Sequence, residues 1–298
     1  MGIEGMPLAL LVNPSAAGGR TMKLLPRVEA ALDEFHLPFR VQRTSHLSDG
    51  VEAALAAIEA GEVPVAISGD GMIGAIGGEM AGADTPLGII PGGRGNDLAR
   101  VLGIPEEPEE AAAVIAAGNT RRIDVGEANG RRFLGIASTG FDAEANRLAN
   151  DTRWLRGNLV YAFAGIVTLL RWKPARFSVK VGDEQIRFTG YSVAAANSPA
   201  YGGGMLLAPD AHLSDGEFDV VMVGETGKLH FLSNLPKVFK GTHVEEDELR
   251  IFRAPRVELS ASRPFAVYAD GEHLTDLPAS LRLLPRALSV IVPPRAGE

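Results

Sequence analysis

The stretch VAISGDGMIGAIGGEM, residues 65–80, carries the strongest signal for the fold, because a short apolar run passes through a glycine-rich turn into a helix-like pattern. Asp70 lies in that turn between Gly69 and Gly71, and glycines let backbone N–H groups come close to an anionic ligand. A carboxylate repels a phosphate unless a divalent cation lies between them or the carboxylate bonds a hydroxyl instead. The turn therefore suggests a site for a metal-bound nucleotide. The alternative is a loop in which Asp70 only caps the following helix.

Strand-like and helix-like segments alternate on both sides of this turn, throughout the first 125 residues. Such alternation predicts a parallel sheet with helices on its faces. Sheets of this kind bind ligands at the carboxyl ends of their strands. Three loops at those ends are rich in small residues, namely NPSAAGGR at 13–20, SGDGMIG at 68–74 and PGGRGND at 91–97.

The second part of the chain has a different pattern, in which alternating strand candidates are joined by short turns such as Gly182-Asp183. We predict a mostly β domain over residues 126–282, with 158–172 as its clearest helix. Residues 1–125 are predicted to form an α/β nucleotide-binding domain, to which a C-terminal segment of about 283–298 could return.

Composition excludes several classes of protein. The chain has 298 residues, a net charge of −8 and no cysteine, so disulfides and thiolate metal sites are excluded. The acidic balance argues against nucleic acid as a partner, and the six histidines lack the paired spacing of a zinc site. No apolar run approaches the roughly 20 residues of a spanning helix. The first apolar run ends at Asn13, as a first strand does, and does not resemble a signal peptide.

The turn at 69–74, GDGMIG, fits the G-x-G-x-x-G pattern of dinucleotide-binding folds, but the rest of that fingerprint is missing. The next strand ends in Pro91 and glycines, where such a fold needs an acidic residue. No GK[ST] sequence occurs, so a Walker loop is absent too. The loop at 91–97 offers Arg94 for phosphate charge and Asn96 and Asp97 at a helix start. Two such loops on neighbouring strands favour a phosphate site over two unrelated turns.

Six motifs occur together in a characteristic order: NPSAAGGR, SGDGMIG, PLGIIPGGRGNDLAR, DVG, APDAHLSDGEFDVV and DGE. In this order and spacing they resemble the diacylglycerol kinase catalytic domain family, which includes bacterial soluble lipid kinases and sphingosine kinases. The resemblance covers nearly the whole chain. It implies a two-domain lipid kinase architecture, with a parallel-sheet α/β nucleotide-binding domain and a mostly β, sandwich-like second domain.

The resemblance also implies an activity. Such an enzyme transfers the γ-phosphoryl group of ATP to a lipid hydroxyl, with Mg²⁺ as cofactor. Diacylglycerol, which would give phosphatidic acid, is the acceptor we expect first, and other lipid alcohols, including sphingoid bases, come behind it. Phosphoryl transfer asks mainly for positioning and charge neutralisation, which glycine loops, carboxylates and Mg²⁺ supply.

The family pattern assigns roles to individual residues. The catalytic residues it implies are Asp70 together with Asp270 and Glu272 of the DGE motif, and Glu272 is our choice for the base, although either carboxylate of that motif could serve. It implies that Asp124 is linked through water to the active-site metal. Nucleotide contacts are implied for Asn13, Pro14, Gly18, Thr44, Ser68, Gly69, Asp70, Gly71, Met72, Gly74, Gly92, Gly93, Arg94 and Asn96.

A structural Mg²⁺ site is also implied, at Asp215 with backbone carbonyls near His212 and Glu217. Two positions depart from the family pattern, because Met72 and Arg94 stand where threonines are common. Met72 has no group that can hydrogen-bond a phosphate, whereas Arg94 offers more charge than a threonine.

A lipid kinase without a membrane span has to reach a bilayer surface to find its substrate. The candidate contact is the stretch at 153–173, with Trp154 and Trp172 near its ends and four flanking cations, Arg153, Arg156, Arg171 and Lys173. A core helix packed on the β domain is the interpretation we prefer. We expect a cytoplasmic protein that associates with membranes peripherally and transiently, with a homodimer left open.

Two rival functions remain. An NAD kinase would share the GDG loop and the two-domain plan, but the loop at 91–97 and the segment SDGEFDVV at 214–221 argue against it. A non-catalytic nucleotide or lipid sensor would not need the catalytic-type carboxylates that this sequence retains.

Overall fold

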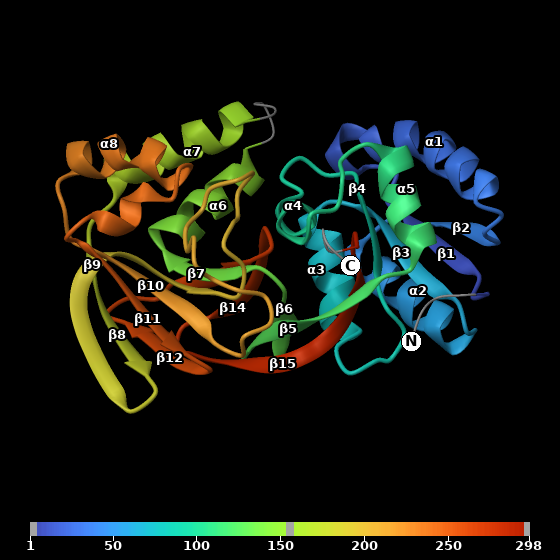
Figure 1. Cartoon of the computed structure of the whole chain (residues 1–298). Coiled ribbons are helices and arrows are strands. Elements are labelled where there is room, and N and C mark those ends of the chain that lie inside the picture. The colour runs from blue at the N-terminus through green and yellow to red at the C-terminus, as the bar shows by residue number, and fades with distance from the viewer. Residues whose placement is uncertain (1–4, 153–157, 295–298) are drawn as a thin grey trace. The chain divides into compact units, whose positions relative to one another are not determined.

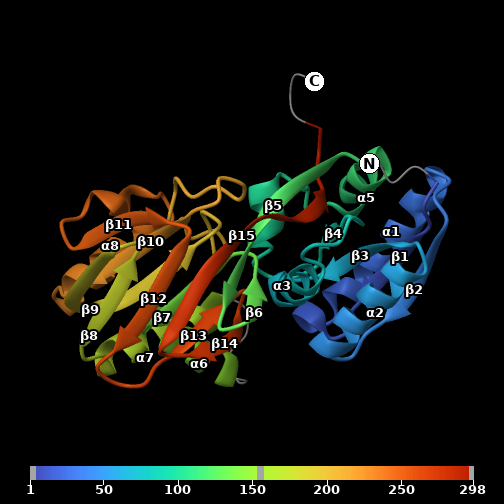
Figure 2. The ribbon, with the colours of Figure 1, turned by 90° about the horizontal axis from the view of Figure 1, so that it is seen from below.

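The computed structural model describes residues 5–152 and 158–294 (Figure 1). The chain divides into two compact units, and unit 1 consists of Met1–Val125 with Pro285–Glu298, whereas unit 2 consists of Gly126–Leu284. Two long strands, β5 (Thr120–Ala128) and β15 (Ala279–Ile291), carry the chain from one unit to the other. They are neighbours in one sheet (Figure 2).

Unit 1 is built on a four-stranded parallel sheet of order β2-β1-β3-β4. Its strands are β1 (Leu8–Val12), β2 (Phe39–Arg43), β3 (Val63–Ser68) and β4 (Gly88–Pro91). Every residue of β1, β3 and β4 is buried, as expected for strands covered on both faces. The parallel α/β architecture predicted for this region is confirmed.

Helices cover both faces of this sheet (Figure 1). α1 packs against α5, and α2 packs against α3. The helices are η1 (Ala16–Gly18), α1 (Arg20–Glu34), α2 (Leu47–Glu59), α3 (Asp70–Glu79), α4 (Asp97–Leu102) and α5 (Pro108–Ala117). Helix α3 begins at Asp70, directly after the extended residue Gly69, so the glycine-rich turn is the N-terminus of a helix.

Unit 2 is mostly antiparallel β, as predicted. Over the described residues, eleven strands including β5 and β15 form one sheet, of order β14-β13-β7-β9-β8-β12-β15-β5-β6, with β10 and β11 continuing from β9. The other strands are β6 (Arg131–Phe133), β7 (Ile136–Gly140), β8 (Ala175–Val181), β9 (Glu184–Ala196), β10 (Phe218–Gly224), β11 (Leu249–Ala254), β12 (Arg256–Ala261), β13 (Ala266–Ala269) and β14 (Glu272–Asp276). The hairpin predicted at Gly182-Asp183 joins β8 to β9, with Val181 opposite Glu184.

An aromatic core joins the helices of unit 2 to its sheet. The helices are α6 (Phe141–Asp151), α7 (Asn158–Arg171), α8 (Lys228–Val238) and η2 (Thr242–Glu245). Trp172, just after α7, is 6% exposed and packs on the rings of Phe141, Tyr191 and Phe265. Trp172 is therefore a core residue and not a membrane anchor, while Trp154, Arg153 and Arg156 lie outside the described residues.

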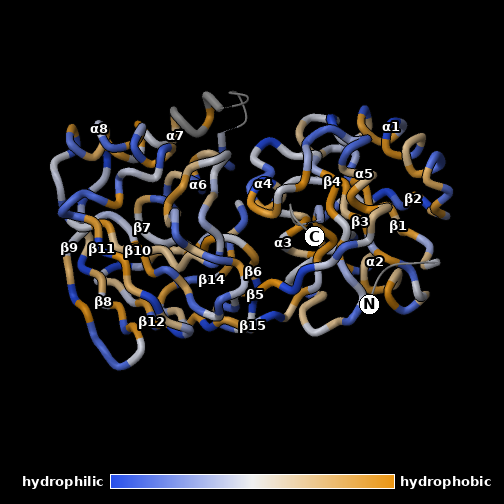
Figure 3. Tube along the Cα trace, in the orientation of Figure 1, coloured by the Kyte–Doolittle hydropathy of each residue, from blue (hydrophilic) through white to orange (hydrophobic). Residues whose placement is uncertain are grey.

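Helix α8 differs from the other helices of the unit because none of its residues is fully buried, and hydrophobic and hydrophilic residues alternate along it (Figure 3). Within 5–152 and 158–294, every helix is too short or too polar to cross a bilayer.

Candidate functional site

The predicted nucleotide residues of unit 1 gather at the carboxyl edge of its sheet. Because the strands are parallel and in register, Val12 lies beside Arg43 and Ile67, and Ser68 lies beside Pro91. Asn13, Thr44, Gly69 and Gly92 therefore begin the four loops at one edge. Two backbone hydrogen bonds continue the sheet there, from Thr44 N to Val12 O (2.9 Å) and from Gly92 N to Ser68 O (2.8 Å).

The first of these loops is fixed by Asn13. Its side-chain Oδ1 accepts hydrogen bonds from Ser15 N (3.0 Å) and Ser15 Oγ (2.7 Å), and its backbone carbonyl accepts one from Thr21 Oγ1 (2.6 Å). Pro14 lies within the same turn. Gly18 and Gly19 have φ values of 70° and 89°, which disfavour any residue with a Cβ. The loop is thus shaped before any ligand arrives.

The two glycine loops that follow β3 and β4 touch through their backbones. A Cβ added at Gly93 would lie 2.5 Å from Gly69 Cα, and one added at Gly69 would lie 3.0 Å from Gly93 Cα. Gly92 is confined in the same way, since its Cβ would lie 2.7 Å from Thr21 Cγ2. Asn96 fixes the second loop by accepting a hydrogen bond from Gly93 N (2.8 Å) at its Oδ1. Only glycine fits at these close approaches.

Asp70 links the two glycine loops. Its carboxylate accepts a hydrogen bond from Leu98 N (3.3 Å) and is also bonded by the backbone amides of Asn96 and Asp97, at the N-terminus of α4. Loss of hydration raises the pKa of the Asp70 carboxyl, and the charge of Asp97 raises it further, against these backbone bonds. The alternative interpretation was that Asp70 only caps the helix that follows it, which is α3. The structure differs, because the Asp70 carboxylate caps α4.

Met72 and Arg94, the two departures from the family pattern, have opposite surroundings. Met72 is 4% exposed, and its sulfur packs on Gly50 of α2 so closely that a Cβ at Gly50 would clash with it. Met72 can therefore offer the loop only its backbone, like Gly71 and Gly74 in the same helix. Arg94 is exposed and has no hydrogen bond or ion pair with the part of the chain that the structure describes.

One contact in unit 1 was not predicted from the sequence. Arg20, at the end of the NPSAAGGR motif, donates from Nη1 to Gly93 O (3.3 Å) and so joins the loop at 13–20 to the loop at 91–97. Its position in a motif already singled out was the available signal. A second cation therefore lies with Arg94 at this edge of the sheet.

In unit 2 the DGE motif forms the turn between β13 and β14, with Ala269 opposite Glu272. Asp270 has a left-handed φ of 52°, which is uncommon for a residue other than glycine. Its Oδ2 accepts from Leu134 N (2.8 Å) and its Oδ1 from Gly135 N (2.9 Å). Both carboxylate oxygens are thus held by the backbone of the β6–β7 connection. These partners are far from Asp270 in the sequence and are visible only in the folded chain.

Glu272 has a different environment two residues later. It is exposed at the start of β14, yet partial desolvation of its carboxyl raises its pKa above the usual range. Asn150 of α6 donates from Nδ2 to Gly271 O (3.0 Å) and so fixes the turn between the two carboxylates. A carboxylate bonded by two amides is a weaker base than one whose pKa is raised. Of the pair, Glu272 has the better environment for a base.

The predicted structural Mg²⁺ site contains an arginine. The guanidinium of Arg253 pairs with Asp215 and lies 3.5 Å from Glu217 Oε2 and 3.8 Å from Asp219 Oδ2. His212 Nδ1 lies 3.3 Å from Ser214 Oγ. Arg253 thus pairs with the same carboxylates that a bound cation would contact. The role of Asp215, His212 and Glu217 in binding Mg²⁺ stays a prediction.

Asp124 of β5 is fully buried in unit 1. Its Oδ1 accepts a hydrogen bond from Arg286 N (2.6 Å), where β15 has a left-handed residue with φ of 49°. Asp124 therefore has a structural role, and its link to an active-site metal stays a prediction.

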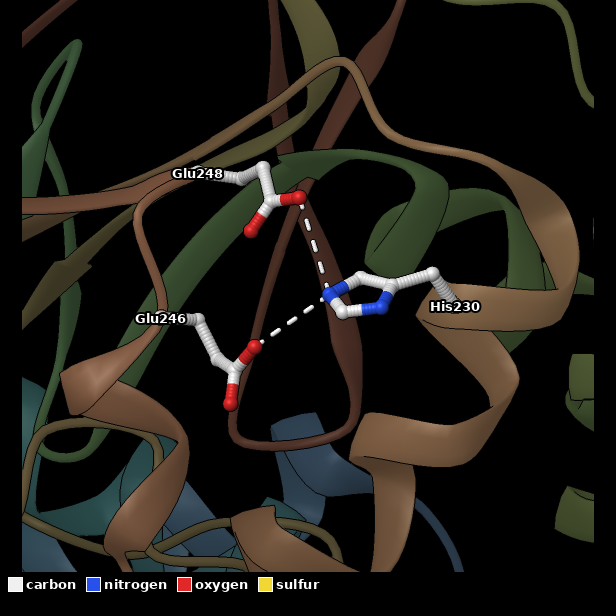
Figure 4. A group of neighbouring side chains, drawn as sticks. All are labelled: His230, Glu246 and Glu248. Carbon is white, nitrogen blue, oxygen red and sulfur yellow. Dashed lines mark ion pairs between the residues drawn. The ribbon is translucent and has the colours of Figure 1, made fainter.

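Among the described residues, one group of three has potential metal-ligand atoms that all lie within 4.8 Å of one another (Figure 4). It consists of His230, Glu246 and Glu248, which were not predicted.

Comparison with known proteins agrees with this architecture. Residues 7–128 match the diacylglycerol kinase catalytic domain, and residues 135–292 match the YegS C-terminal NAD kinase beta sandwich-like domain. A diacylglycerol kinase of Mycobacterium tuberculosis H37Rv is 38% identical over 291 residues, which cover 95% of this chain and 94% of that protein. A probable lipid kinase YegS-like protein of Chromohalobacter salexigens is 31% identical and covers 90% of this chain and 89% of its own.

A solved structure shares the fold. The crystal structure of a diacylglycerol kinase from Bacillus anthracis is 20% identical, with a TM-score of 0.75 over 97% of both chains. The sequence relatives and the two matched domains together cover nearly the whole chain. This protein therefore belongs to the diacylglycerol kinase family of lipid kinases.

Proposed function

We propose that the protein transfers the γ-phosphoryl group of ATP to the hydroxyl of diacylglycerol, giving phosphatidic acid, in a reaction that depends on Mg²⁺. The observation that carries this proposal is the backbone contact between Gly69 and Gly93, with Asp70 bonded across it to α4. Such a cradle is suited to phosphate, because small residues let amides approach the oxygens and a helix start adds positive potential.

The nucleotide is held in this proposal by the loops of unit 1. Backbone amides of the Gly69 and Gly92–Gly93 turns bind phosphate oxygens, and Arg94, exposed and unpaired among the described residues, supplies charge to the transferred group. Met72 contributes no side-chain contact, since it is packed on Gly50. Arg94 thereby compensates for the hydroxyl that Met72 lacks.

The residues also fit Mg²⁺. Desolvation raises the pKa of Asp70, and its carboxylate forms no ion pair with a lysine or arginine in the part of the chain that the structure describes. Asp70 would hold the metal directly, and Asp124 would do so through water. Mg²⁺ would neutralise charge on the phosphates.

Glu272 takes the proton of the acceptor hydroxyl in this proposal. Its raised pKa makes it a better proton acceptor than a free glutamate, and an alcohol nucleophile needs a base within hydrogen-bond reach. Asp270, fixed by Leu134 N and Gly135 N, orients the turn that carries Glu272. The lipid acceptor lies at a membrane surface, so the protein acts as a peripheral, transiently bound enzyme of the cytoplasm.

The test is transfer of label from [γ-³²P]ATP with Mg²⁺ to diacylglycerol, to sphingosine and to NAD, each in parallel. NAD is included because residues 135–292 match an NAD kinase beta sandwich-like domain. We expect labelled phosphatidic acid, and a fall in kcat of about 10²–10⁴-fold in Glu272→Gln, the usual contribution of a general base. Glu225→Gln, at an exposed glutamate of the same unit, is the control and should keep full activity.

The other outcomes separate the rivals. Labelled NADP without labelled lipid would identify an NAD kinase. ATP binding without transfer to any acceptor would identify a sensor. Equal activity of Glu272→Gln and wild type would remove Glu272 from the reaction.

A further inference from the structure

Helix α8 of unit 2 exposes a continuous apolar stripe. Leu229 is 85% exposed, Leu232 41% and Phe239 54%, and Pro236 between them is exposed as well. The spacing of these four residues is three, four and three, which places them on one face of a helix. Single exposed leucines are common on protein surfaces, whereas an aligned set on one helix face is not.

The opposite face of α8 holds the helix in place, so the stripe is not required for packing. Phe231 stacks on Tyr191 with ring centroids 4.4 Å apart and meets Phe141 edge-on at 4.8 Å. These contacts join α8 to the core over β9 and α6. The stripe is therefore an exposed surface on a helix whose orientation is fixed by the packing of its opposite face.

Ion pairs secure the flank of the same helix (Figure 4). His230 Nε2 lies 3.2 Å from Glu246 Oε2 and 3.6 Å from Glu248 Oε1. Lys237 Nζ lies 2.5 Å from Glu246 Oε1. Lys237 thereby offsets the charge of Glu246, which lies in the connection between η2 and β11.

Lys228 and Lys240 flank the stripe in the sequence, in a chain that is acidic as a whole and that continues into the acidic residues 245–248. Residues 158–173 and 228–240 hold five lysines and arginines and no aspartate or glutamate, although the chain carries a net charge of −8. Lys228 Nζ donates to Leu170 O (2.7 Å), so the end of α7 adjoins the start of α8. Leu170, 70% exposed, and Ile166, 50% exposed, extend the apolar surface onto α7.

We propose that this surface, which we call the α8 stripe (Leu229, Leu232, Pro236 and Phe239), docks unit 2 on an anionic lipid bilayer. Apolar side chains enter the acyl boundary, and the surrounding cations meet anionic head groups. A second copy of the chain is a poorer occupant, because a two-fold contact at the stripe would bring the same lysines together. The inference rests on the proposed function, which places the acceptor lipid in a membrane.

The experiment measures vesicle binding by co-sedimentation, without ATP, with vesicles of phosphatidylcholine and phosphatidylglycerol at 3:1 and with pure phosphatidylcholine. The variant is Leu229→Glu/Leu232→Glu/Phe239→Glu. The matched control is Phe35→Glu/Leu55→Glu, which changes two exposed hydrophobic residues of unit 1 (46% and 39% exposed). Circular dichroism and size in sedimentation velocity check that each variant is folded.

We expect wild type to bind the anionic vesicles more tightly than the neutral ones. The triple variant should bind them at least about tenfold more weakly, a difference of about 1.4 kcal/mol, and the control should bind like wild type. Equal binding by the triple variant, or an equal loss in the control, would overturn the proposal. A wild-type dimer that the triple variant turns into a monomer would overturn it in favour of a second copy.

Kinase assays on diacylglycerol in mixed micelles keep this test separate from the proposed function. Micellar activity in the triple variant, with vesicle binding lost, supports docking by the α8 stripe. Vesicle binding that depends on the stripe, with no kinase activity in wild type, supports the docking surface and overturns the proposed function alone.

Discussion

Unit 1 and unit 2 each place an aspartate before a glycine in a tight turn, Asp70 in GDG and Asp270 in DGE. The two carboxylates differ in their hydrogen-bond partners and in their solvation. Asp270 has both oxygens bonded by backbone amides of one connection, at 2.8 and 2.9 Å. Asp70 is bonded at the start of α4 but is desolvated beside Asp97, so its pKa is raised. The Asp270 carboxylate is fixed by two amides, whereas Asp70 has no ion pair among the described residues and is suited to acquire a positive partner with the nucleotide.

The largest expected effect comes from removing either charge. Asp70→Asn and Asp270→Asn should each lower kcat by about 10²–10³-fold, the range for losing one electrostatic contact in a polar active site. Stability should separate the two. Asp270→Asn turns an amide donor toward Leu134 N or Gly135 N and should cost about 1–3 kcal/mol of unfolding free energy. Asp70→Asn keeps an acceptor for Leu98 N and removes a desolvated charge, so it should cost less stability than Asp270→Asn.

Urea unfolding at pH 7.5 and initial rates with diacylglycerol test both halves of this prediction. If the two variants lost equal stability, the contrast drawn between the two carboxylates would be wrong. If Asp70→Asn kept full activity, the metal role proposed for Asp70 would fail while the structural comparison stood.

The fold and the outline of the site followed from the sequence because they depend on local signals. Strand–turn–helix alternation and small residues at 13–20, 68–74 and 91–97 are visible within a few residues of one another. The partners of the two carboxylates are not local. Asp70 bonds Leu98, 28 residues away, and Asp270 bonds Leu134, 136 residues away, so only the folded chain reveals them. The packing of Met72 on Gly50 was hidden for the same reason.

The next largest effect should come from separating the glycine loops that Asp70 joins. In Gly93→Ala the new Cβ would lie 2.5 Å from Gly69 Cα, so the loops must move apart. We expect KM for ATP to rise about 10–100-fold, with a stability cost of about 1–3 kcal/mol from overpacking. Gly227→Ala, where no atom lies within 4 Å of the new Cβ, is the control in unit 2 and should leave KM for ATP unchanged. An unchanged KM in Gly93→Ala would mean that the loop contact does not shape the nucleotide site.

A smaller effect concerns the helix that carries Asp70. In Gly50→Ala the new Cβ clashes with the sulfur of Met72, which should cost about 1–3 kcal/mol of stability. Met72→Thr opens a space there and restores the threonine common in the family. The double variant should therefore be more stable than the sum of the single effects, with a coupling of about 0.5–3 kcal/mol, measured as a double-mutant cycle by urea unfolding. Additive effects would show that the two side chains do not share this space.

The smallest expected effect is on stability and concerns a third carboxyl, Asp142 in the first turn of α6, which can be compared with Asp70 and Asp270. Burial raises its pKa to about 6, and a hydrogen bond from Ser192 opposes the rise. Between pH 4 and 6 the native state therefore binds more protons than the unfolded state, and the free energy of unfolding falls as pH rises through this window. Asp142→Asn should remove the contribution of this carboxyl to that fall and be more stable than wild type above pH 6 by about 1–2 kcal/mol, discounted for partial access of water.

Urea unfolding from pH 4 to 8 measures this difference, and Asp183→Asn in the exposed β8–β9 turn is the control, with no change expected in the pH profile. Parallel profiles for wild type and Asp142→Asn would mean that the carboxyl is ionised at little cost. Desolvation alone would then not account for a raised pKa in this fold. The charge of Asp97 would become the main reason that Asp70 differs from Asp270.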